Sequence, residues 1–429
     1  MRTIDIGILL CEQITLDFNG EYLFGDTVVA GRHTVASDNG KLRWNGQNYA
    51  TIRFVPKDAD SNFVLHNVMI GVNFHWQRYE QQSFSGELIF IVEDGNVRAV
   101  NRLPVEEYLV SVISSEMSAT SSLELLKAHT IISRSWLYAQ LERKKCTEAV
   151  KGWCAPEETI RWYDRDDHTL FDFCADDHCQ RYQGVSRAVN PNVRKAVEET
   201  ANIVLKYDGK VCDARFSKCC GGVTERFSAC WEQEDKPYLV PLRDAAAGEL
   251  PDLCNEAAAR EWIESVPDAF CANVDKKTVE QVLNGYDRET SDFYRWNVQY
   301  SQSELSELLF RRSGIDFGAV QELVPVERAA SGRIVRLKIS GTNAVHIVGK
   351  ELEIRRWLSE THLYSSAFVV DKLYDESLGE NVFVIKGAGW GHGVGLCQIG
   401  AAVMGEKGYS YDQILSHYYP DTSLEPILH

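Results

Sequence analysis

The chain contains 429 residues, more than one small domain needs, and this length predicts two or three domains or one large core with insertions. Hydrophobic residues make up 44% and charged residues 25% of the chain, a globular composition that excludes wholesale disorder. A formal net charge of -17 excludes a general binder of nucleic acid or anionic membranes. A neutral or weakly charged substrate fits this charge.

The N-terminal sequence MRTIDIGILLCEQ contains an apolar run that is too short for a signal peptide or a membrane span. We therefore expect no transmembrane segment, and either a cytoplasmic chain or a mature form without its leader. Twelve cysteines, many of them between Cys146 and Cys271, are too few for a disulfide scaffold. Their clustering indicates a metal site, or some disulfides if the protein is exported.

Residues 1–100 are predicted to form a β-rich region. The turn signals DNG, NGQ and EDGN separate segments such as KLRW, YATIRFV and ELIFIV, the last rich in β-branched and aromatic residues. The clearest local prediction is a hairpin from Glu87 to Val100 that turns at Asp94 and Gly95.

Residues 104–143 are predicted to form two helices. Pro104 suits the first turn of the first helix. Ser121 and Glu124 have the spacing of a capping box for the second helix. The break between the helices is expected at residues 116–122.

The remainder of the chain alternates between irregular, strand-like and helical patterns. Residues 243–330 are polar and mostly helical in pattern, and strands resume afterwards. Ser410 is expected to cap the last helix, and Pro420 to end it. The predicted class is therefore α+β, a β-rich scaffold with a few helices and a mostly helical insertion. The predicted units are residues 1–100, 101–242, 243–330 and 331–429.

Glu116, in the segment VISSEM, occupies an unusual position. It follows Leu109 and Val112 on the apolar stripe of the first predicted helix. A solvated glutamate at a helix end is the simplest interpretation, because buried glutamates are rare unless they are paired or used. A carboxyl group against apolar walls has a raised pKa, which suits a general acid in sugar hydrolysis.

The segment GAGWGHGVGLCQIGA, residues 387–401, is a glycine-rich loop with six glycines. Its glycines allow close approach of the backbone to a ligand. Trp390, His392 and Gln398 are its functional side chains, suited to stacking on sugars and bonding their hydroxyls. A structural glycine turn is the alternative. The loop matches neither the P-loop nor a dinucleotide-binding unit.

The segment HTLFDFCADDHCQRYQG contains a candidate metal site made of His168, Cys174, His178 and Cys179. Two histidines and two cysteines match a tetrahedral zinc set, although the spacing is not that of a zinc finger. A reduced cysteine pair or a disulfide between Cys174 and Cys179 are the alternatives. Four protein ligands would make such a zinc structural.

Two further segments contribute candidate substrate-binding residues. The segment FSKCCGGVTE offers Ser217, Thr224 and Glu225, while its cysteine pair suits packing or a disulfide with Cys212 or Cys230. The segment FHWQRYEQQSF offers side chains that could flank a sugar groove; an exposed strand with an internal ion pair is the alternative. The candidates of this second segment, with the serine that precedes the candidate acid, are His75, Trp76, Arg78, Glu80 and Ser115.

Three of these segments together resemble the SpoIID/LytB family. RLPVEEYLVSVISSEMSATSSLELLKAHTIISRSWLYAQ resembles its core, and GAGWGHGVGLCQIGAAVMGEKGYSYDQILSHYYP resembles its C-terminal signature. CCGGVTE, followed by CW and YL, resembles its middle motif. The segment with His168 is similar to the family's zinc-binding segment. The family often has proline and tryptophan after the Glu-Met pair, where this chain has SATSSLE.

The resemblance implies a lytic transglycosylase of peptidoglycan glycan strands. Such an enzyme cuts between N-acetylmuramic acid and N-acetylglucosamine in peptide-stripped strands and leaves 1,6-anhydro ends. Glu116 aligns with the catalytic glutamate, and the His/Cys segment with the zinc ligands. The LytB branch implies the alternative, a non-catalytic enhancer of a cell-wall amidase. Both place the protein in the cell envelope, periplasm or extracellular space.

One acid is enough for this reaction. A hydrolase generally needs a second carboxylate as nucleophile or base. In a transglycosylase, Glu116 would protonate the glycosidic oxygen and then take the proton of the sugar C6 hydroxyl as the ring closes.

Overall fold

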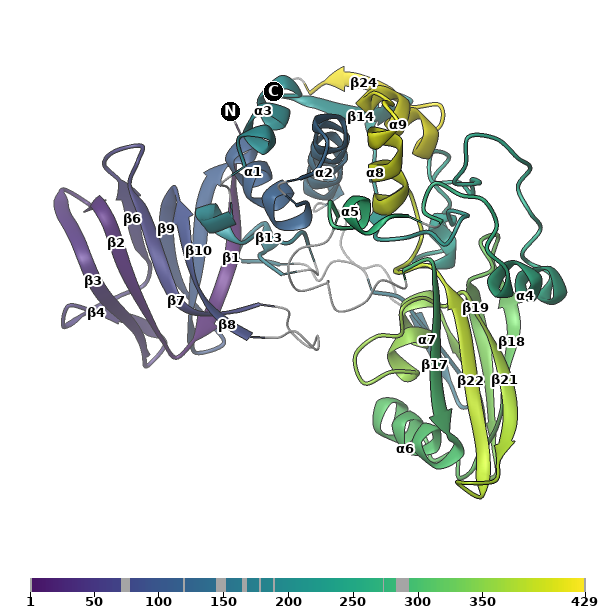
Figure 1. The fold of residues 1–429 in the computed structure, drawn as a ribbon. Coiled ribbons are helices and arrows are strands. Elements are labelled where there is room, and N and C mark those ends of the chain that lie inside the picture. Colours follow the sequence, from purple (N-terminus) through teal and green to yellow (C-terminus); the bar gives the residue numbers. More distant parts are fainter. Residues whose placement is uncertain are drawn as a thin grey trace.

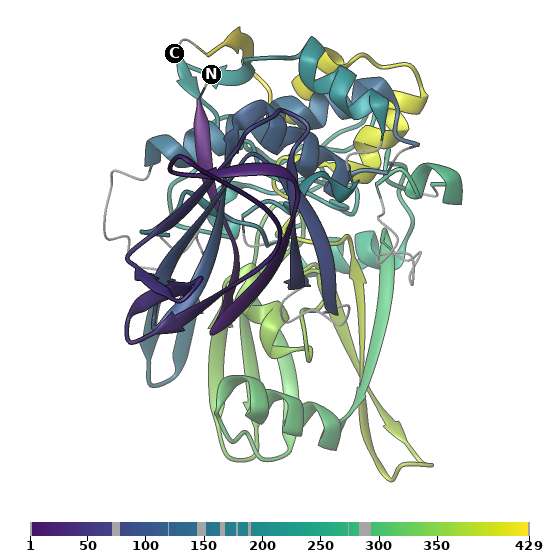
Figure 2. The ribbon, with the colours of Figure 1, turned by 90° about the vertical axis from the view of Figure 1, so that its left-hand side faces the viewer.

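The computed structural model describes residues 2–70, 78–118, 120–143, 152–163, 168–176, 179–187, 190–272, 274–282 and 293–427. An N-terminal sheet and a group of C-terminal sheets lie on opposite sides of a layer of helices (Figure 1). Both chain ends lie close together beside that layer in two perpendicular views (Figures 1 and 2). The predicted α+β class is confirmed.

The N-terminal region forms one large sheet in the order β13-β1-β10-β9-β6-β2-β3-β4-β5, and β7 joins β2 to β8. The predicted hairpin is confirmed, because β9 and β10 pair directly and both turn residues, Asp94 and Gly95, have positive φ. The strands are β1 (Thr3–Cys11), β2 (Gln13–Phe24), β3 (Thr27–Asp38), β4 (Lys41–Trp44), β5 (Gln47–Tyr49), β6 (Ile52–Pro56), β7 (Asn62–Ile70), β8 (Arg78–Ser85), β9 (Glu87–Glu93), β10 (Asn96–Pro104) and β13 (Phe173–Cys174).

The two predicted helices are α1 (Val105–Glu116) and α2 (Leu123–Arg143), so the break between them lies where the sequence placed it. The predicted capping box is wrong. The hydroxyl of Ser122, one residue later, accepts the N–H of Leu125 at 3.3 Å. Ser121 instead donates to the carbonyl of Gln281. A long-range contact has replaced the local cap.

The middle of the chain folds into short elements around these helices. α3 packs against α1 and α2, and β14 pairs with both β15 and the last strand. These elements are β11 (Gly152–Ala155), β12 (Glu158–Arg161), η1 (Gly184–Arg187), α3 (Pro191–Glu199), β14 (Ile203–Tyr207), β15 (Lys210–Val211), β16 (Phe216–Ser217) and η2 (Phe227–Ala229).

The segment predicted as a mostly helical insertion also contains two strands. β17 pairs with β22, and β18 with β19, so sheet hydrogen bonds cross the predicted boundary at residue 330. Strand pairing partners are set by tertiary contacts, which a local pattern does not carry. The elements are α4 (Glu256–Glu264), α5 (Lys276–Val279), β17 (Arg295–Ser301), α6 (Gln302–Ser313), β18 (Val320–Arg328), β19 (Ile334–Gly341), β20 (Val345–Gly349), α7 (Glu351–Trp357), β21 (Phe368–Asp375) and β22 (Glu380–Ala388).

The chain ends in β23 (Leu396–Cys397), α8 (Gln398–Glu406), α9 (Tyr411–Tyr418) and β24 (Ser423–Pro426). Ser410 caps α9 as predicted, and its N–H donates to the side chain of Gln413. α8 and α9 both pack against α2, which returns the C-terminal signature to the centre of the molecule. Among the described residues, no helix is long and apolar enough to cross a membrane.

Candidate active site and metal centres

Glu116 is the last residue of α1, and its side chain is half-buried. Leu109 and Val112, on the same stripe, are fully buried, so the predicted helical stripe extends to the acid. The N–H of Met117 still bonds to the carbonyl of Ile113 at 2.9 Å, and the chain then turns away. The carboxylate therefore lies at the negative end of the helix dipole, where negative charge is disfavoured.

The turn after Glu116 is fixed by Gln281, which is distant in the sequence. The carbonyl of Gln281 accepts the N–H of Ser118 and the hydroxyl of Ser121, each at 2.8 Å. Lys218, in the middle motif, donates to the neighbouring carbonyl of Val282 at 2.6 Å. Through these bonds, the turn that follows Glu116 and Met117 and the middle motif both contact residues 281–282.

Two predicted substrate-binding serines lie in the interior. Ser115 is 1% exposed and Ser217 is 6% exposed. Neither hydroxyl has a hydrogen-bond partner among the described residues. Buried hydroxyls are normally satisfied, so these two positions have unused capacity for a ligand or water.

Gln398 and Thr224 are committed to internal hydrogen bonds. The amide of Gln398 donates to Nε2 of His129 at 3.0 Å, and both residues are buried. Burial, reinforced by the charge of Lys218, lowers the pKa of His129 to about 3. Thr224 donates to the carbonyl of Val240 and accepts the N–H of Leu242. In this structure Gln398 connects α8 to α2, and Thr224 connects the middle motif to residues 240–242.

The aromatic residues of the glycine-rich loop are half-buried. Trp390 packs between Phe293 and Tyr364, with ring centroids at 4.8 and 4.4 Å. His392 accepts the N–H of Val394 on Nδ1 and meets Trp231 edge to face. Burial, followed by the charges of nearby arginines, keeps the pKa of His392 well below its ordinary value. The ring is therefore neutral at pH 7.

The described part of the strand that carries the predicted groove residues has the ion pair expected for an exposed strand, the alternative to a sugar groove. Arg78 donates to Glu80 at 2.7 Å within β8, the ion pair expected for that interpretation. His75 and Trp76 lie outside the described residues.

Three of the four predicted metal ligands converge. We call His168, Cys174 and Cys179 the edge cluster; their ligand atoms all lie within 4.8 Å of one another. Nε2 of His168 is 3.6 Å from Sγ of Cys179, and the N–H of Cys174 points at the same sulfur at 3.4 Å. Both cysteines are half-buried and form no disulfide, so the disulfide alternative is not formed. His178 lies outside the described residues.

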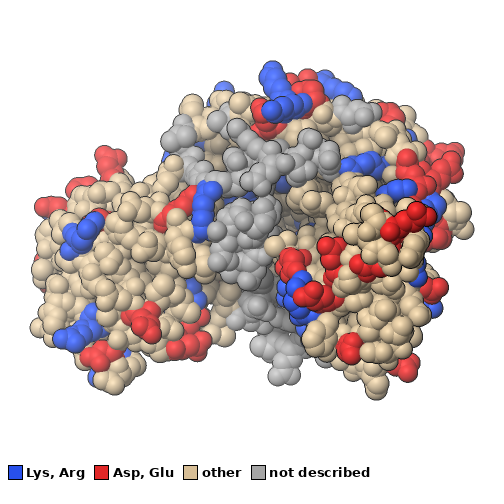
Figure 3. All heavy atoms as spheres, turned by 60° about the horizontal axis from the view of Figure 1, so that its bottom comes forward, with Lys and Arg blue, Asp and Glu red and all other residues tan. Residues whose placement is uncertain are grey.

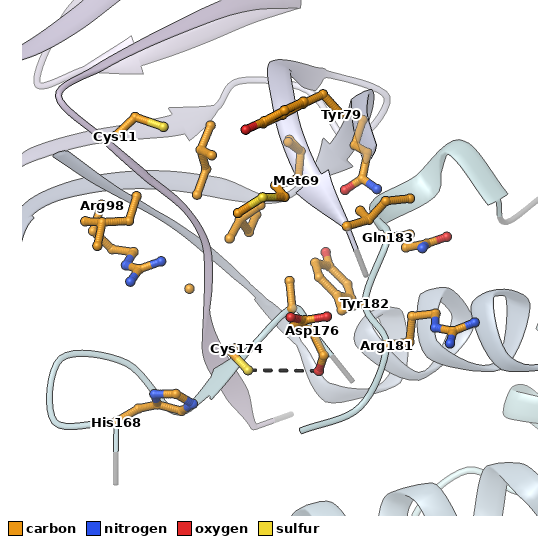
Figure 4. A pocket seen from close by; sticks show the side chains of 18 residues that line it. Cys11, Met69, Tyr79, Arg98, His168, Cys174, Asp176, Arg181, Tyr182 and Gln183 are labelled. Carbon is orange, nitrogen blue, oxygen red and sulfur yellow. Dashed lines mark hydrogen bonds between the residues drawn. The ribbon is translucent and has the colours of Figure 1, made fainter. Parts of the chain in front are cut away.

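A cavity of about 480 Å³ opens beside the edge cluster. Strands β1, β7 and β8 line it, and Figure 4 shows His168 and Cys174 at one end with Tyr79 at the other. Glu116 is not among its lining residues. Burial raises the pKa of Tyr108 well above its ordinary value, and the charges of Cys179, Cys174, Tyr182 and Glu116 raise it further.

Sequence comparisons match these same regions. The family model described as stage II sporulation protein matches residues 93–207, and a domain of unknown function matches residues 225–395. The amidase enhancer of Bacillus subtilis is 27% identical over 321 residues, 74% of this chain and 40% of that protein. Stage II sporulation protein D of the same organism is 23% identical over 329 residues, 76% of both chains.

The resemblance to the SpoIID/LytB family is confirmed by the family model over residues 93–207 and by these relatives, whose matches cover 74% and 76% of the chain. An uncharacterised protein of Brachyspira hyodysenteriae is also similar, at 25% identity over 336 residues. The region that matches the family model includes Glu116 and the whole edge cluster. The chain spans less than half the length of the amidase enhancer that it matches.

A second set of candidate metal ligands was not predicted. We call Cys220, Asp244, Cys271 and Cys397 the buried cluster; their ligand atoms also lie within 4.8 Å of one another, and all four residues are buried. In the sequence, the cysteine pair and the glycine-rich loop are separate motifs. No local pattern joins residues 177 positions apart, so only the fold brings Cys220 and Cys397 together.

Proposed function

We propose that this SpoIID/LytB family member is a peptidoglycan lytic transglycosylase with Glu116 as its acid and base. The family match supports a role related to the cell wall. The observation that carries the finer proposal is the placement of Glu116, a half-buried carboxyl group at the C-terminal end of α1 inside the matched region. Burial and the helix dipole both favour the neutral acid that the first step requires.

The proposed reaction needs no second carboxylate. The protonated Glu116 gives its proton to the oxygen between N-acetylmuramic acid and N-acetylglucosamine as that bond breaks. The resulting carboxylate takes the proton of the C6 hydroxyl, whose oxygen bonds to C1 and closes the 1,6-anhydro ring. Glu116 is then protonated again, and no water is consumed.

The substrate contacts are proposed from the candidate side chains next to Glu116, in the middle motif and in the glycine-rich loop. The buried hydroxyls of Ser115 and Ser217 have no partner among the described residues and suit sugar hydroxyls. Trp390 and His392 offer aromatic and neutral polar surface for the glycan. On the face in Figure 3, uncharged residues cover most of the surface and charges of both signs are interspersed, which suits a weakly charged ligand.

The edge cluster fits zinc, which the family implies. Its 3.6 Å separation between nitrogen and sulfur is close to an edge of a tetrahedral site with metal bonds of about 2.0–2.3 Å. We propose that His168, Cys174 and Cys179, with His178, hold a structural zinc. Bound there, the ion would fix the segment after β13 against β1. The proposed location is the cell envelope, periplasm or extracellular space, where the glycan lies.

The test is Glu116→Gln incubated with peptide-stripped glycan, with mass spectrometry of the products. The variant should lose at least about 100-fold in the rate of 1,6-anhydro product formation, because it removes the acid–base group. Glu107→Gln is the matched control, since this glutamate on the same helix forms a half-exposed ion pair with Arg194. Wild-type activity of a folded Glu116→Gln protein would refute the catalytic role.

The second candidate is a non-catalytic enhancer of a cell-wall amidase. The 27% identical relative named amidase enhancer favours it. It predicts that the wild-type protein binds glycan, releases no 1,6-anhydro product and stimulates an added amidase. Product release by the wild-type protein alone would decide for the transglycosylase.

A further inference from the structure

The buried cluster has the dimensions of a single tetrahedral metal site. Sγ of Cys220 lies 3.6 Å from Sγ of Cys271 and 3.3 Å from Oδ2 of Asp244. Metal–sulfur bonds of about 2.3 Å at tetrahedral angles place neighbouring sulfurs about 3.8 Å apart. A disulfide requires about 2.05 Å between sulfurs, so the thiols stand at ligand spacing and are not bonded. All four cluster atoms lie within 4.8 Å, which leaves room for one ion.

Backbone hydrogen bonds hold the segments of the cluster in register. The N–H of Asp244 bonds to the carbonyl of Gly222 at 3.0 Å, and its own carbonyl accepts the N–H of Phe270 at 2.6 Å. The N–H of Ile399 bonds to the carbonyl of Lys218 at 3.1 Å. The ligands therefore sit on four segments that the fold has already joined, so binding an ion would order little additional chain.

The backbone also points N–H groups at the sulfurs. Sγ of Cys397 receives N–H groups from Cys220 at 3.3 Å and from Gly400 at 3.4 Å, the second from the first turn of α8. Sγ of Cys220 receives the N–H of Gly222 at 3.4 Å. Donated hydrogen bonds and a helix N-terminus stabilise thiolates, which are the form of cysteine that binds metals.

Asp244 is a buried carboxylate whose surroundings suit a cation. Its exposure is 0%, and no lysine or arginine pairs with it among the described residues. Tyr418 donates to Oδ1 at 2.7 Å, and His417 approaches the same oxygen at 3.7 Å. This leaves Oδ2 facing Cys220. Buried carboxylates are normally ion-paired or metal-bound, and an oriented second oxygen is typical of a ligating carboxylate.

We propose that Cys220, Asp244, Cys271 and Cys397 bind one zinc ion in a closed structural site, separate from the edge cluster. Thiolate-rich tetrahedral sets select zinc among the common divalent ions, and four protein ligands leave no open position for catalysis. The ion joins the middle motif, the segment 243–330 and the glycine-rich loop. The inference is independent of glycan cleavage, since it uses none of the proposed catalytic residues.

The test is metal analysis of protein purified under reducing conditions without added metal. Cys271→Ser and Cys397→Ser should each lower the zinc content by about one equivalent per chain relative to wild type. Cys212→Ser is the matched control, a buried cysteine outside the cluster, and should leave the content unchanged.

A measurement on the wild-type protein covers the case in which these variants fail to fold. Anomalous diffraction at the zinc edge should show a peak about 2.3 Å from the three sulfurs. No peak there, or unchanged zinc in the two folded ligand variants, would overturn the proposal. So would a disulfide between Cys220 and Cys271 found in the purified protein by mass spectrometry after thiol alkylation.

Discussion

The two candidate metal centres differ in where their ligands come from and in how deeply they lie. The edge cluster takes its ligands from a stretch of twelve positions, 168–179, and its residues are half-buried beside a cavity. The buried cluster takes its ligands from four segments across 178 positions, 220–397, and all of them are buried. A short-range set can tie down one loop, whereas a long-range set cross-links parts of the fold. The first therefore affects local order and the second the stability of the whole protein.

The largest effect expected from this comparison concerns chelation. Saturating zinc at about 1,000 times its dissociation constant contributes about 4 kcal/mol to the free energy of unfolding. In Cys174→Ser the buried cluster remains, and in Cys271→Ser the edge cluster remains. A chelator should lower the melting temperature of Cys174→Ser by more than that of Cys271→Ser. Equal shifts in calorimetry would show that the two centres stabilise the protein alike.

The next effect is a pH dependence near the buried cluster. His129 contacts α8, which begins just after Cys397, and its folded pKa is about 3 against 6.5 for a free histidine. Below pH 6.5, His129 becomes protonated in the unfolded state but stays neutral in the folded state. The free energy of unfolding therefore falls as the pH drops towards 3. The slope reaches about 1.4 kcal/mol per pH unit.

The comparison variant for this slope is His129→Gln, which keeps a side chain able to bond to Gln398 and does not titrate. Denaturant titrations of the two proteins from pH 7 to pH 4 measure the difference. The variant should lose less stability than wild type on acidification. Parallel curves would mean that His129 takes no part in the acid sensitivity.

A smaller effect is expected from a substitution that crowds the buried cluster and leaves the edge cluster undisturbed. Gly400 lies on α8, and a Cβ atom there would stand 2.7 Å from Oδ2 of Asp244 and would also collide with Tyr418. Gly400→Ala should cost about 1–3 kcal/mol through overpacking, despite the helix propensity of alanine, and should lower zinc only at the buried cluster. Val403→Ala, on the same helix, adds no volume and serves as the control in thermal unfolding and metal analysis. Full zinc in Gly400→Ala would contradict the assigned role of Asp244.

The smallest effect is expected far from both clusters. Arg78 is partly exposed and pairs with Glu80 within β8. Arg78→Ala should change the free energy of unfolding by less than about 1 kcal/mol and leave both metals bound. A glycan-binding assay on the same variant adds a second readout. A large loss of affinity would support the predicted sugar contact, and an unchanged affinity would assign Arg78 to the strand surface alone.

Local patterns in the sequence predicted much of the fold. The β9–β10 hairpin, the two helices around Glu116 and the capped last helix follow from turn residues, apolar spacing and a capping serine. The capping box at Ser121 failed because Gln281, 160 positions away, takes that hydroxyl. The strands β17 and β18 within the predicted helical segment were missed because their partners lie beyond residue 330.

The candidate site residues also divide into those that a local pattern indicates and those whose contacts depend on the fold. Glu116 and the members of the edge cluster could be proposed from sequence because each candidate depends on neighbours within one helix or one loop. The internal roles of Thr224 and Gln398 could not be predicted, since a polar side chain in a loop has the same local pattern whether it faces a ligand or a buried histidine.

By itself, the sequence determined which segments are candidates to carry chemistry: the acid at the end of α1, the His/Cys segment and the glycine-rich loop. These depend on residue type and short spacing, which local backbone geometry converts directly into position. Only the tertiary structure decided that Cys220, Asp244, Cys271 and Cys397 meet. Their convergence results from the packing of α8 against α2 and from backbone bonds between distant loops, and such contacts leave no periodicity in the chain.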